Sequence, residues 1–164
     1  KQKHLLLSTG NKSEYAVGYC TLYGDMNGGL SVIGDLYKTS VFKLCHWLDS
    51  DKSCQCRKSL MLPENEDLVG RSIRTKPPSA ELRPNQFDSD SLPDYEILDP
   101  ILKELIEEDN DPSTLIQQKY GTDLIEKIQK LLKKAEFKRR QAPPVLKVSN
   151  QAFGSGWRKP IAST

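Results

Sequence analysis

The sequence predicts an α/β fold in which most of the chain beyond the first strand is helical. The apolar run Leu5–Leu7 is typical of a short buried strand, and it stops at polar residues that begin a helix. Further along, residues 97–106 and 122–139 repeat apolar side chains at the period of an α-helix. The strand-like stretches are too few for a complete parallel sheet, so we expect an earlier part of the domain to precede this chain.

The composition favours a protein with one core and no membrane span. The chain has 164 residues, of which 37% are hydrophobic, and no apolar run approaches the roughly 20 residues of a membrane helix. The formal net charge of +2 predicts neither a nucleic acid nor a membrane as partner. The chain does not begin with Met and shows no signal-peptide pattern, so we expect a cytoplasmic protein of which this is a part.

The four cysteines favour a reducing compartment. Cys20 and Cys45 fall in apolar helical patterns and are interpreted as small core residues. Cys54 and Cys56 form a C-x-C, which lacks the C-x-x-C spacing of common zinc sites. We therefore expect no metal or redox centre at that segment.

The first third of the chain alternates extended and helical patterns. The expected elements are a strand at residues 5–7, a helix at 11–23, a glycine-rich loop at 24–29, an extended piece at 30–33 and a helix at 38–49. Ser13 is an alternative N-cap of the first helix. Its inward face comprises Ala16, Val17 and Cys20, with Tyr23 as a further candidate. The inward face of the second helix comprises Val41, Leu44, Cys45 and Leu48.

Polar residues and prolines interrupt the middle of the chain. Residues 50–73 lack a hydrophobic period and are predicted to form a surface loop or insertion that is mobile in part. Three prolines within residues 75–84 exclude a regular helix there. Apolar periodicity returns at Ile97, but Pro100 fits best in a first turn, so the next helix is expected to start near Asp99.

The clearest helical pattern lies at residues 122–139. A shorter helix precedes it, with Asp111 or Ser113 as its expected cap. Residues 122–139 carry one continuous apolar stripe with lysines opposite, and two prolines at 143–144 end the helical region. The stripe comprises Leu124, Ile125, Ile128, Leu131, Leu132 and Ala135.

The turn between the first strand and the first helix is a candidate anion site. Thr9 and Gly10 offer a hydroxyl and backbone N–H groups at the positive end of a helix, a setting in which phosphate binds well. Glu14, about one turn into the helix, can hold a divalent cation beside such a phosphate. The alternative is an ordinary capped helix with an exposed glutamate, and the spacing alone favours that alternative.

Three further segments carry groups suited to an anionic or hydroxylated ligand. Asp25 lies on a glycine-rich loop, where a carboxylate accepts hydrogen bonds either from ribose hydroxyls or from its own backbone. Ser79 is stiffened by neighbouring prolines, which either present its hydroxyl to an anion or form a rigid connector. Lys138 and Arg139 end a helix, where cations stabilise the terminus and can also clamp a phosphate. No protein nucleophile is legible, so we assign no catalytic residue.

Taken together and in order, six segments resemble NAD synthetase, specifically the glutamine-dependent type found in bacteria. The segments are STGNKSE (8–14), GYCTLYGDMNGG (18–29), KPPSAELRPNQ (76–86), DSDSLPDYEILD (88–99), FKRRQAPPVLKVS (137–149) and AFGSGWRKPIA (152–162). The resemblance covers nearly the whole chain apart from about residues 50–73. It implies that residues 1–164 are the C-terminal portion of the synthetase domain, with the adenine nucleotide alpha hydrolase-like, Rossmann-like three-layer fold.

The resemblance also implies a reaction and its binding residues. Mg-ATP adenylates the carboxylate of deamido-NAD, and ammonia derived from glutamine attacks the acyl-adenylate to give NAD. The implied ATP contacts are Thr9, Lys38 and Ser79. The implied deamido-NAD contacts are Glu14, Asp25, Lys138 and Arg139, with Glu14 also a magnesium ligand. The family's oligomeric habit implies a homo-oligomer at full length.

The sequence departs from the family at two places and leaves alternatives open. The family's Ser-Gly-Gly-x-Asp-Ser pyrophosphate loop and its Cys-Glu-Lys glutaminase domain are not in this sequence, and we expect both upstream. The isolated fragment is therefore expected to be inactive. One alternative is a non-catalytic fragment or nucleotide-binding module of the same fold. Another is a different ATP-pyrophosphatase, such as GMP synthetase.

Overall fold

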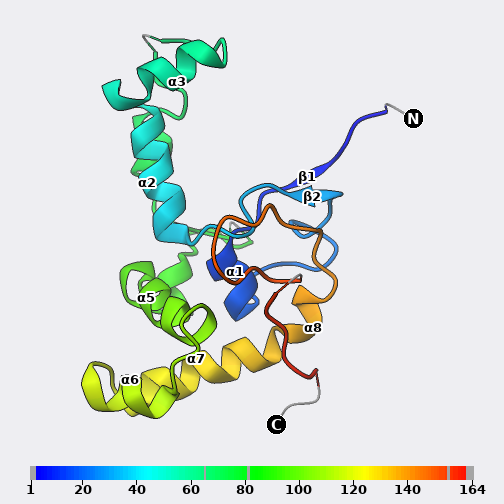
Figure 1. The fold of residues 1–164 in the computed structure, drawn as a ribbon, viewed down its shortest axis with the longest axis vertical. Coiled ribbons are helices and arrows are strands. Elements are labelled where there is room, and N and C mark those ends of the chain that lie inside the picture. Colours follow the sequence, from blue (N-terminus) through cyan, green and yellow to red (C-terminus); the bar gives the residue numbers. More distant parts are fainter. Residues whose placement is uncertain (1–2, 65, 81, 155, 162–164) are drawn as a thin grey trace. The chain divides into compact units, whose positions relative to one another are not determined.

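The chain divides into two compact units. The computed structural model describes residues 3–64, 66–80, 82–154 and 156–161 (Figure 1). The first unit contains Lys1–Lys38 and Glu96–Thr164, and the second contains Thr39–Tyr95. The first unit holds the strands and the core helices, while the second holds one long helix and several short helical turns.

A small parallel sheet opens the first unit. β1 (Leu7–Ser8) pairs with β2 (Leu30–Ser31), and Ser31 also forms an isolated parallel bridge to Val145. Both extended pieces are thus confirmed, but the expected burial of Leu5–Leu7 is wrong, because these side chains are 66%, 62% and 47% exposed. A parallel sheet is normally covered on both faces. In the described part of the chain only β2 pairs with β1, and the leucines remain largely uncovered.

α1 (Lys12–Val17) follows β1 and is shorter than the predicted helix. Its N-cap is Asn11, not Ser13, and Asn11 and Glu14 form a reciprocal capping box. The helix ends because Gly18 adopts a left-handed conformation at φ 73° and ψ 22°. Tyr23 consequently lies outside the helix and is 83% exposed, so its predicted place on an inward face is wrong.

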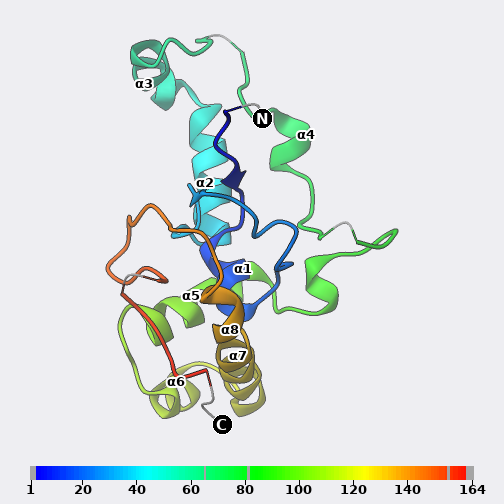
Figure 2. The same cartoon turned by 90° about the vertical axis from the view of Figure 1, so that its right-hand side faces the viewer.

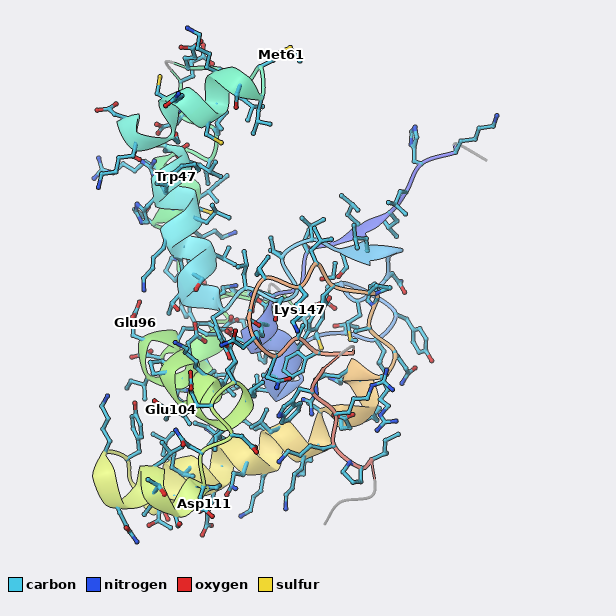
Figure 3. All side chains as sticks on the ribbon, viewed as in Figure 1. Trp47, Met61, Glu96, Glu104, Asp111 and Lys147 are labelled. Atoms are coloured by element: carbon cyan, nitrogen blue, oxygen red, sulfur yellow. The ribbon has the colours of Figure 1, made fainter. Side chains whose placement is uncertain are left out.

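The second unit begins with most of α2 (Lys38–Leu48), which confirms the second predicted helix. None of the residues of α2 is buried, so its predicted inward face is wrong for this chain. Trp47 is 36% exposed, and Figure 3 shows its side chain on the helix. The short elements that follow are η1 (Asp51–Ser53), α3 (Cys54–Ser59), α4 (Arg71–Arg74) and η2 (Asp88–Asp90).

Residues 50–73 are more regular than predicted. Asp49 accepts hydrogen bonds from the backbone amides of residues 68, 69 and 70 and pairs with Arg74 at 2.6 Å. Arg57 is buried and donates to the carbonyls of Leu48, Pro63 and Glu66. These two charged side chains order a segment with no hydrophobic period, which is why the sequence pattern did not reveal its helical turns.

Four helices provide the core of the first unit: α5 (Tyr95–Ile106), α6 (Pro112–Gln118), α7 (Thr122–Lys134) and α8 (Glu136–Arg139). α5 starts four residues before the predicted Asp99, so Pro100 lies inside the helix rather than in its first turn. Asp111 caps α6, as predicted. The predicted helix at 122–139 is interrupted at Ala135, and Figure 2 shows α8 following directly on α7.

The predicted apolar stripe of the long helix is confirmed at its centre. Ile125 and Ile128 are completely buried, and Leu132 and Ala135 are nearly so. α7 and α8 both contact α1, and α6 contacts α7. In the part of the chain that the structure describes, no helix has the length and apolar character needed to span a membrane.

Candidate functional site

Each of the first three residues of α1 forms a hydrogen bond with the segment 35–38. The backbone N–H of Lys12 donates to the carbonyl of Leu36 at 2.8 Å, and the backbone N–H of Lys38 donates to Oγ of Ser13 at 2.9 Å. Glu14 Oε1 accepts from Nζ of Lys38 at 2.8 Å. We call this set of contacts the α1 latch. It brings together two predicted site residues, Glu14 and Lys38, that are 24 positions apart in the sequence.

Lys12 supports the α1 latch through ion pairs and hydrogen bonds of its side chain to other segments. Its side chain is completely buried, and Nζ lies 3.0 Å from Oδ1 of Asp35 and 2.7 Å from Oε1 of Glu107. Nζ also donates to Oγ of Ser149 at 2.7 Å and to the carbonyl of Gln151 at 2.8 Å. A buried cation needs this degree of pairing, because an unpaired charge would carry a large desolvation penalty.

Asp35 is held in its ionised form by the same cluster. Burial opposes ionisation, but hydrogen bonds from the amides of Ser149 and Val148, together with Lys12, outweigh it and lower the pKa of Asp35. Ser149 Oγ lies 2.8 Å from Oδ1 of Asp35. The C-terminal segment around Ser149 is thereby tied to the loop that precedes Lys38.

Thr9 lies between β1 and α1, on the exposed side of the turn. The turn itself is closely packed, since a Cβ at Gly10 would stand 2.7 Å from the ring of Tyr15. The hydroxyl of Tyr15 lies within hydrogen-bonding distance of Ser8 and Ser31. The packing of Tyr15 therefore fixes the backbone around Thr9, while Thr9 itself is exposed to solvent.

Asp25 lies on the loop beside β1. Its carbonyl accepts a hydrogen bond from Oγ of Ser8 at 2.8 Å, which holds the loop against the strand. Its carboxylate is exposed and accepts from the backbone N–H of Thr21 at 2.5 Å. This is the turn-stabilising bond that the sequence left as one alternative, and the exposure leaves the carboxylate accessible to a ligand as well.

Lys138 and Arg139 close the other end of α1. Nζ of Lys138 donates to the carbonyls of Gly18 at 2.8 Å and Cys20 at 2.7 Å. Arg139 is buried and donates to the carbonyls of Tyr15 and Ala16 and to the carboxylate of Glu136. Both cations thus satisfy carbonyls that a helix end leaves without partners.

Burial governs the protonation of Cys20, whose carbonyl Lys138 contacts. Burial raises the pKa of the Cys20 thiol to about 11, although the nearby Lys138 partly offsets that effect. The thiol is therefore largely protonated at neutral pH, which disfavours its action as a nucleophile. All four cysteines are free.

Ser79 belongs to the second unit. It lines an open pocket of about 530 Å³ together with Lys76, Pro77, Arg83 and Phe87. Its hydroxyl donates to the carbonyl of Gln86. Among the described residues 76–80 and 82–84 there is no helix, as the prolines predict. The stiffening of Ser79 and the presentation of its hydroxyl to an anion stay predictions.

The fit of a magnesium ion rests on Glu14 alone. Among the residues that the structure describes, no three His, Cys, Asp or Glu side chains form a cluster that could hold a metal. Oε2 of Glu14 accepts from the amide of Asn11, and Oε1 faces Lys38. Magnesium often takes only one or two protein carboxylates and completes its shell with substrate phosphates and water. Glu14 fits that role as a single ligand only.

Lys12, Asp35 and Ser149 were not anticipated as parts of the site. In the sequence, Lys12 stands among polar residues and looks like a solvated lysine. Ser149 lies 137 positions away, and no local pattern connects the two. Ser13 was considered only as a helix cap, whereas its hydroxyl bridges Lys38 and Asp99.

Comparison with known proteins places these residues in a family. The family model described as NAD synthase matches residues 1–142. Proteins named glutamine-dependent NAD(+) synthetase are 54% identical in Synechocystis sp. and 45% identical in Thermotoga maritima, each over 97% of this chain and 26% of the relative. The chain therefore spans about a quarter of the length of these relatives.

A solved structure shows the same fold. The crystal structure of a glutamine-dependent NAD(+) synthetase from Cytophaga hutchinsonii matches 98% of this chain and 24% of its own, with a TM-score of 0.66 and 22% identity. This match confirms the predicted adenine nucleotide alpha hydrolase-like fold class. The family match over residues 1–142 shows that the chain belongs to the NAD synthase family.

Proposed function

We propose that this chain supplies substrate-binding residues of a glutamine-dependent NAD(+) synthetase, a ligase that converts deamido-NAD to NAD. The observation that carries the proposal is the α1 latch, which fixes the Glu14–Lys38 ion pair on the helix that begins three residues after the exposed Thr9. In this proposal residues 1–164 are the C-terminal portion of the synthetase domain. Ammonia from glutamine is the nitrogen donor, and the enzyme acts in the cytoplasm as a homo-oligomer.

The proposed roles follow from the charges that the reaction handles. Adenylation brings a triphosphate against a carboxylate and releases pyrophosphate, so the site must offset several negative charges. Lys38 supplies a cation and Thr9 a hydroxyl for the ATP phosphates, and Ser79 supplies a second hydroxyl. No residue of the chain needs to act as a nucleophile, because ammonia attacks the activated carbonyl of the bound substrate.

The dinucleotide is proposed to lie against the exposed loop of Asp25. The carboxylate of Asp25 is accessible, and ribose hydroxyls are suitable donors to it. Lys138 donates two hydrogen bonds to backbone carbonyls, which leaves one N–H of its ammonium group for a ligand. A ligand contact by Arg139 requires exchange of at least one of its present bonds.

Magnesium belongs to the proposal as a companion of ATP. Glu14 would hold it, and the ion would offset the charge of the transferring phosphates. In the structure Lys38 neutralises Glu14, so the lysine and the ion compete for the same carboxylate. Binding of phosphate by Lys38 would release Glu14 for the metal, which couples the two events in a single site.

The proposal is tested in the full-length protein that contains this chain. NAD formation from deamido-NAD, ATP and glutamine is measured for the wild type and for Lys38→Ala and Glu14→Ala. We expect each substitution to lower kcat/KM by about 100-fold, the scale for losing a charged contact to the reacting groups. Lys43→Ala, an exposed lysine on the same helix as Lys38, is the matched control and should leave turnover unchanged.

The outcomes separate the competing functions. A wild type that forms no NAD with either glutamine or ammonia would contradict the synthetase proposal and favour a non-catalytic nucleotide-binding module. Turnover with xanthosine monophosphate in place of deamido-NAD would favour a GMP synthetase. If NAD forms but Lys38→Ala and Glu14→Ala turn over like Lys43→Ala, the reaction is right and the assigned residues are wrong.

A further inference from the structure

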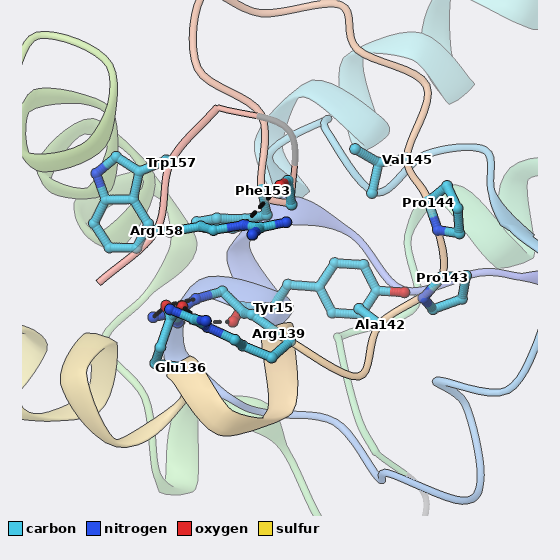
Figure 4. A pocket seen from close by; sticks show the side chains of 12 residues that line it. Tyr15, Glu136, Arg139, Ala142, Pro143, Pro144, Val145, Phe153, Trp157 and Arg158 are labelled. Atoms are coloured by element: carbon cyan, nitrogen blue, oxygen red, sulfur yellow. Dashed lines mark hydrogen bonds and ion pairs between the residues drawn. The ribbon is translucent and has the colours of Figure 1, made fainter. Parts of the chain in front are cut away.

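A further pocket borders α8 and does not include Lys138 in its lining. The pocket has a volume of about 420 Å³, within the range of roughly 300–1,000 Å³ typical of small-molecule sites. Its walls come from α8, from the Pro143–Pro144 segment and from the C-terminal tail, with Tyr15 of α1 at its base (Figure 4). Arg139 is the only one of the predicted site residues among those that line it.

The charges that line the pocket are unbalanced. Three guanidinium groups, those of Arg139, Arg140 and Arg158, face one carboxylate, that of Glu136. Both oxygens of Glu136 are already engaged, because Oε2 accepts from Arg139 at 3.0 Å and Oε1 accepts from Arg140 at 3.0 Å. The described residues of the lining therefore include no further carboxylate that could pair with Arg158.

Arg139 belongs to the wall rather than to the open space. It is 5% exposed, and its nitrogens donate to three backbone carbonyls and to Glu136. Its guanidinium also lies 5.1 Å from the ring centre of Phe153 and 5.2 Å from that of Trp157. These contacts hold Arg139 in the wall of the pocket, so Arg140 and Arg158 are the arginines that can recognise a ligand.

Arg140 and Arg158 are each anchored at one side and open at the other. Nε of Arg158 donates to the carbonyl of Gly154 at 2.9 Å, and Nη2 of Arg140 donates to that of Lys159 at 3.0 Å. Within the described ranges of the chain, Nη1 of Arg140 and both terminal nitrogens of Arg158 have no hydrogen-bond partner. Figure 4 shows Arg158 across the pocket from Arg139 and Glu136.

We propose that this pocket binds a phosphate-bearing small molecule, with its phosphate held by the terminal nitrogens of Arg140 and Arg158. Guanidinium groups match phosphate with paired hydrogen bonds, and anchoring at one side reduces the entropy lost on binding. The site is separate from the α1 latch, so this inference does not depend on the proposed synthetase function.

The test uses the full-length protein with inorganic pyrophosphate and AMP as probes. Trp157 lines the pocket, so the fluorescence difference between the wild type and Trp157→Phe reports occupancy there. The binding series is repeated in Arg140→Gln/Arg158→Gln. Lys130→Gln/Lys134→Gln is the matched control, because it removes the same charge from exposed positions of α7. The series is also repeated in Lys38→Ala, which removes the contribution of probe bound at the α1 latch to the measured binding.

We expect saturable binding that weakens at least about tenfold in the arginine variant and changes less than about twofold in the lysine control. Binding of AMP but not of pyrophosphate would assign the nucleoside part a role in recognition. The proposal is overturned if the Trp157 signal does not saturate, or if both double variants weaken it equally. If Trp157→Phe alters folding, ³¹P line broadening of the probe in the same variants gives the same decision.

Discussion

The two ends of α1 both carry buried or half-buried cations, but the partners of those cations differ. At the N-terminal end, Lys12 is paired with the carboxylates of Asp35 and Glu107. At the C-terminal end, Lys138 and Arg139 donate chiefly to backbone carbonyls. One end is therefore held by charge pairs between distant segments, and the other by cations that complete the hydrogen bonding of a helix terminus.

The N-terminal end of α1 therefore depends on charge pairs, whereas its C-terminal end depends mainly on hydrogen-bond donors. Removing Lys12 would leave two acids in a buried cluster, whereas removing a C-terminal cation would mainly leave uncharged carbonyls. The end that depends on charge is also the end that carries Thr9, Glu14 and Lys38. The α1 latch and the candidate ATP contacts thus share one electrostatic support.

The largest expected effect is that of Lys12→Met. The substitution keeps the side-chain length but removes the cation from between Asp35 and Glu107, so we expect α1 to lose about 3–5 kcal/mol of stability. The measurement is hydrogen exchange at the α1 amides in the full-length protein. Activity should fall with it, because the latch would no longer hold the segment 35–38.

A triple variant distinguishes lost charge pairing from lost packing. Lys12→Met combined with Asp35→Asn and Glu107→Gln removes all three charges, and we expect it to recover much of the stability lost by Lys12→Met. Arg139→Met serves as the comparison at the other end, where Glu136 keeps its pair with Arg140 and the loss should be smaller. Equal losses for Lys12→Met and the triple variant would contradict the charge-based account.

The next effect is a loss of stability in acid to which the N-terminal end of α1 contributes through Asp35. The pKa of Asp35 is lowered in the folded protein, so its contribution is present above its unfolded pKa of about 3.9 and is lost as pH falls through the folded pKa. Urea unfolding between about pH 5 and pH 2 should show a steeper decline for the wild type than for Asp35→Asn.

The matched control for the acid effect is Asp94→Asn, which removes an exposed carboxylate. We expect its stability to follow the wild-type decline across the same pH range. Equal slopes for the wild type and Asp35→Asn would show that the buried cluster does not set the acid limit. The carbonyl partners of Lys138 do not titrate in this range, so Lys138→Met should also keep the wild-type slope.

The sequence revealed the partners of the cations at neither end of α1. A local rule places Lys138 and Arg139 at the end of their own helix, where cations are favoured. In the structure they donate instead to carbonyls of residues 15–20, which lie 118–124 positions away in the sequence. The Lys12 cluster joins residues 12, 35, 107 and 149, and no local pattern reveals such long-range pairing. Glu14 and Lys38 were identified by family resemblance, but their direct ion pair was not foreseen.

The boundaries of α1 show why local reading fails in detail. The apolar period continues to Cys20, which predicts a longer helix, but the left-handed conformation of Gly18 ends α1 at Val17. At the start, Asn11 outcompetes Ser13 as the cap, because Ser13 bonds Lys38 and Asp99 instead. In both cases a specific tertiary or backbone requirement overrides a pattern that is correct on average.

The smallest expected effect tests the C-terminal cap itself. Gly18 has φ 73°, and an added Cβ would lie 2.9 Å from Cβ of Ala135 at the start of α8. Gly18→Ala should therefore cost about 1–2 kcal/mol, from the strained backbone and the close contact. The measurement is the urea midpoint of the full-length protein, supported by hydrogen exchange at α1 and α8.

Gly121→Ala is the matched control for the cap. Gly121 has φ −67°, and no atom lies within 4 Å of an added Cβ, so the substitution adds no steric strain. Because Gly121 is the N-cap of α7, where Ala is a poor residue, we expect a small loss that is below that of Gly18→Ala. A loss for Gly18→Ala no greater than that for Gly121→Ala would mean that α1 can end without the left-handed cap. In that case the carbonyl contacts of Lys138 and Arg139 alone would terminate the helix, and the two ends of α1 would both depend on their cations.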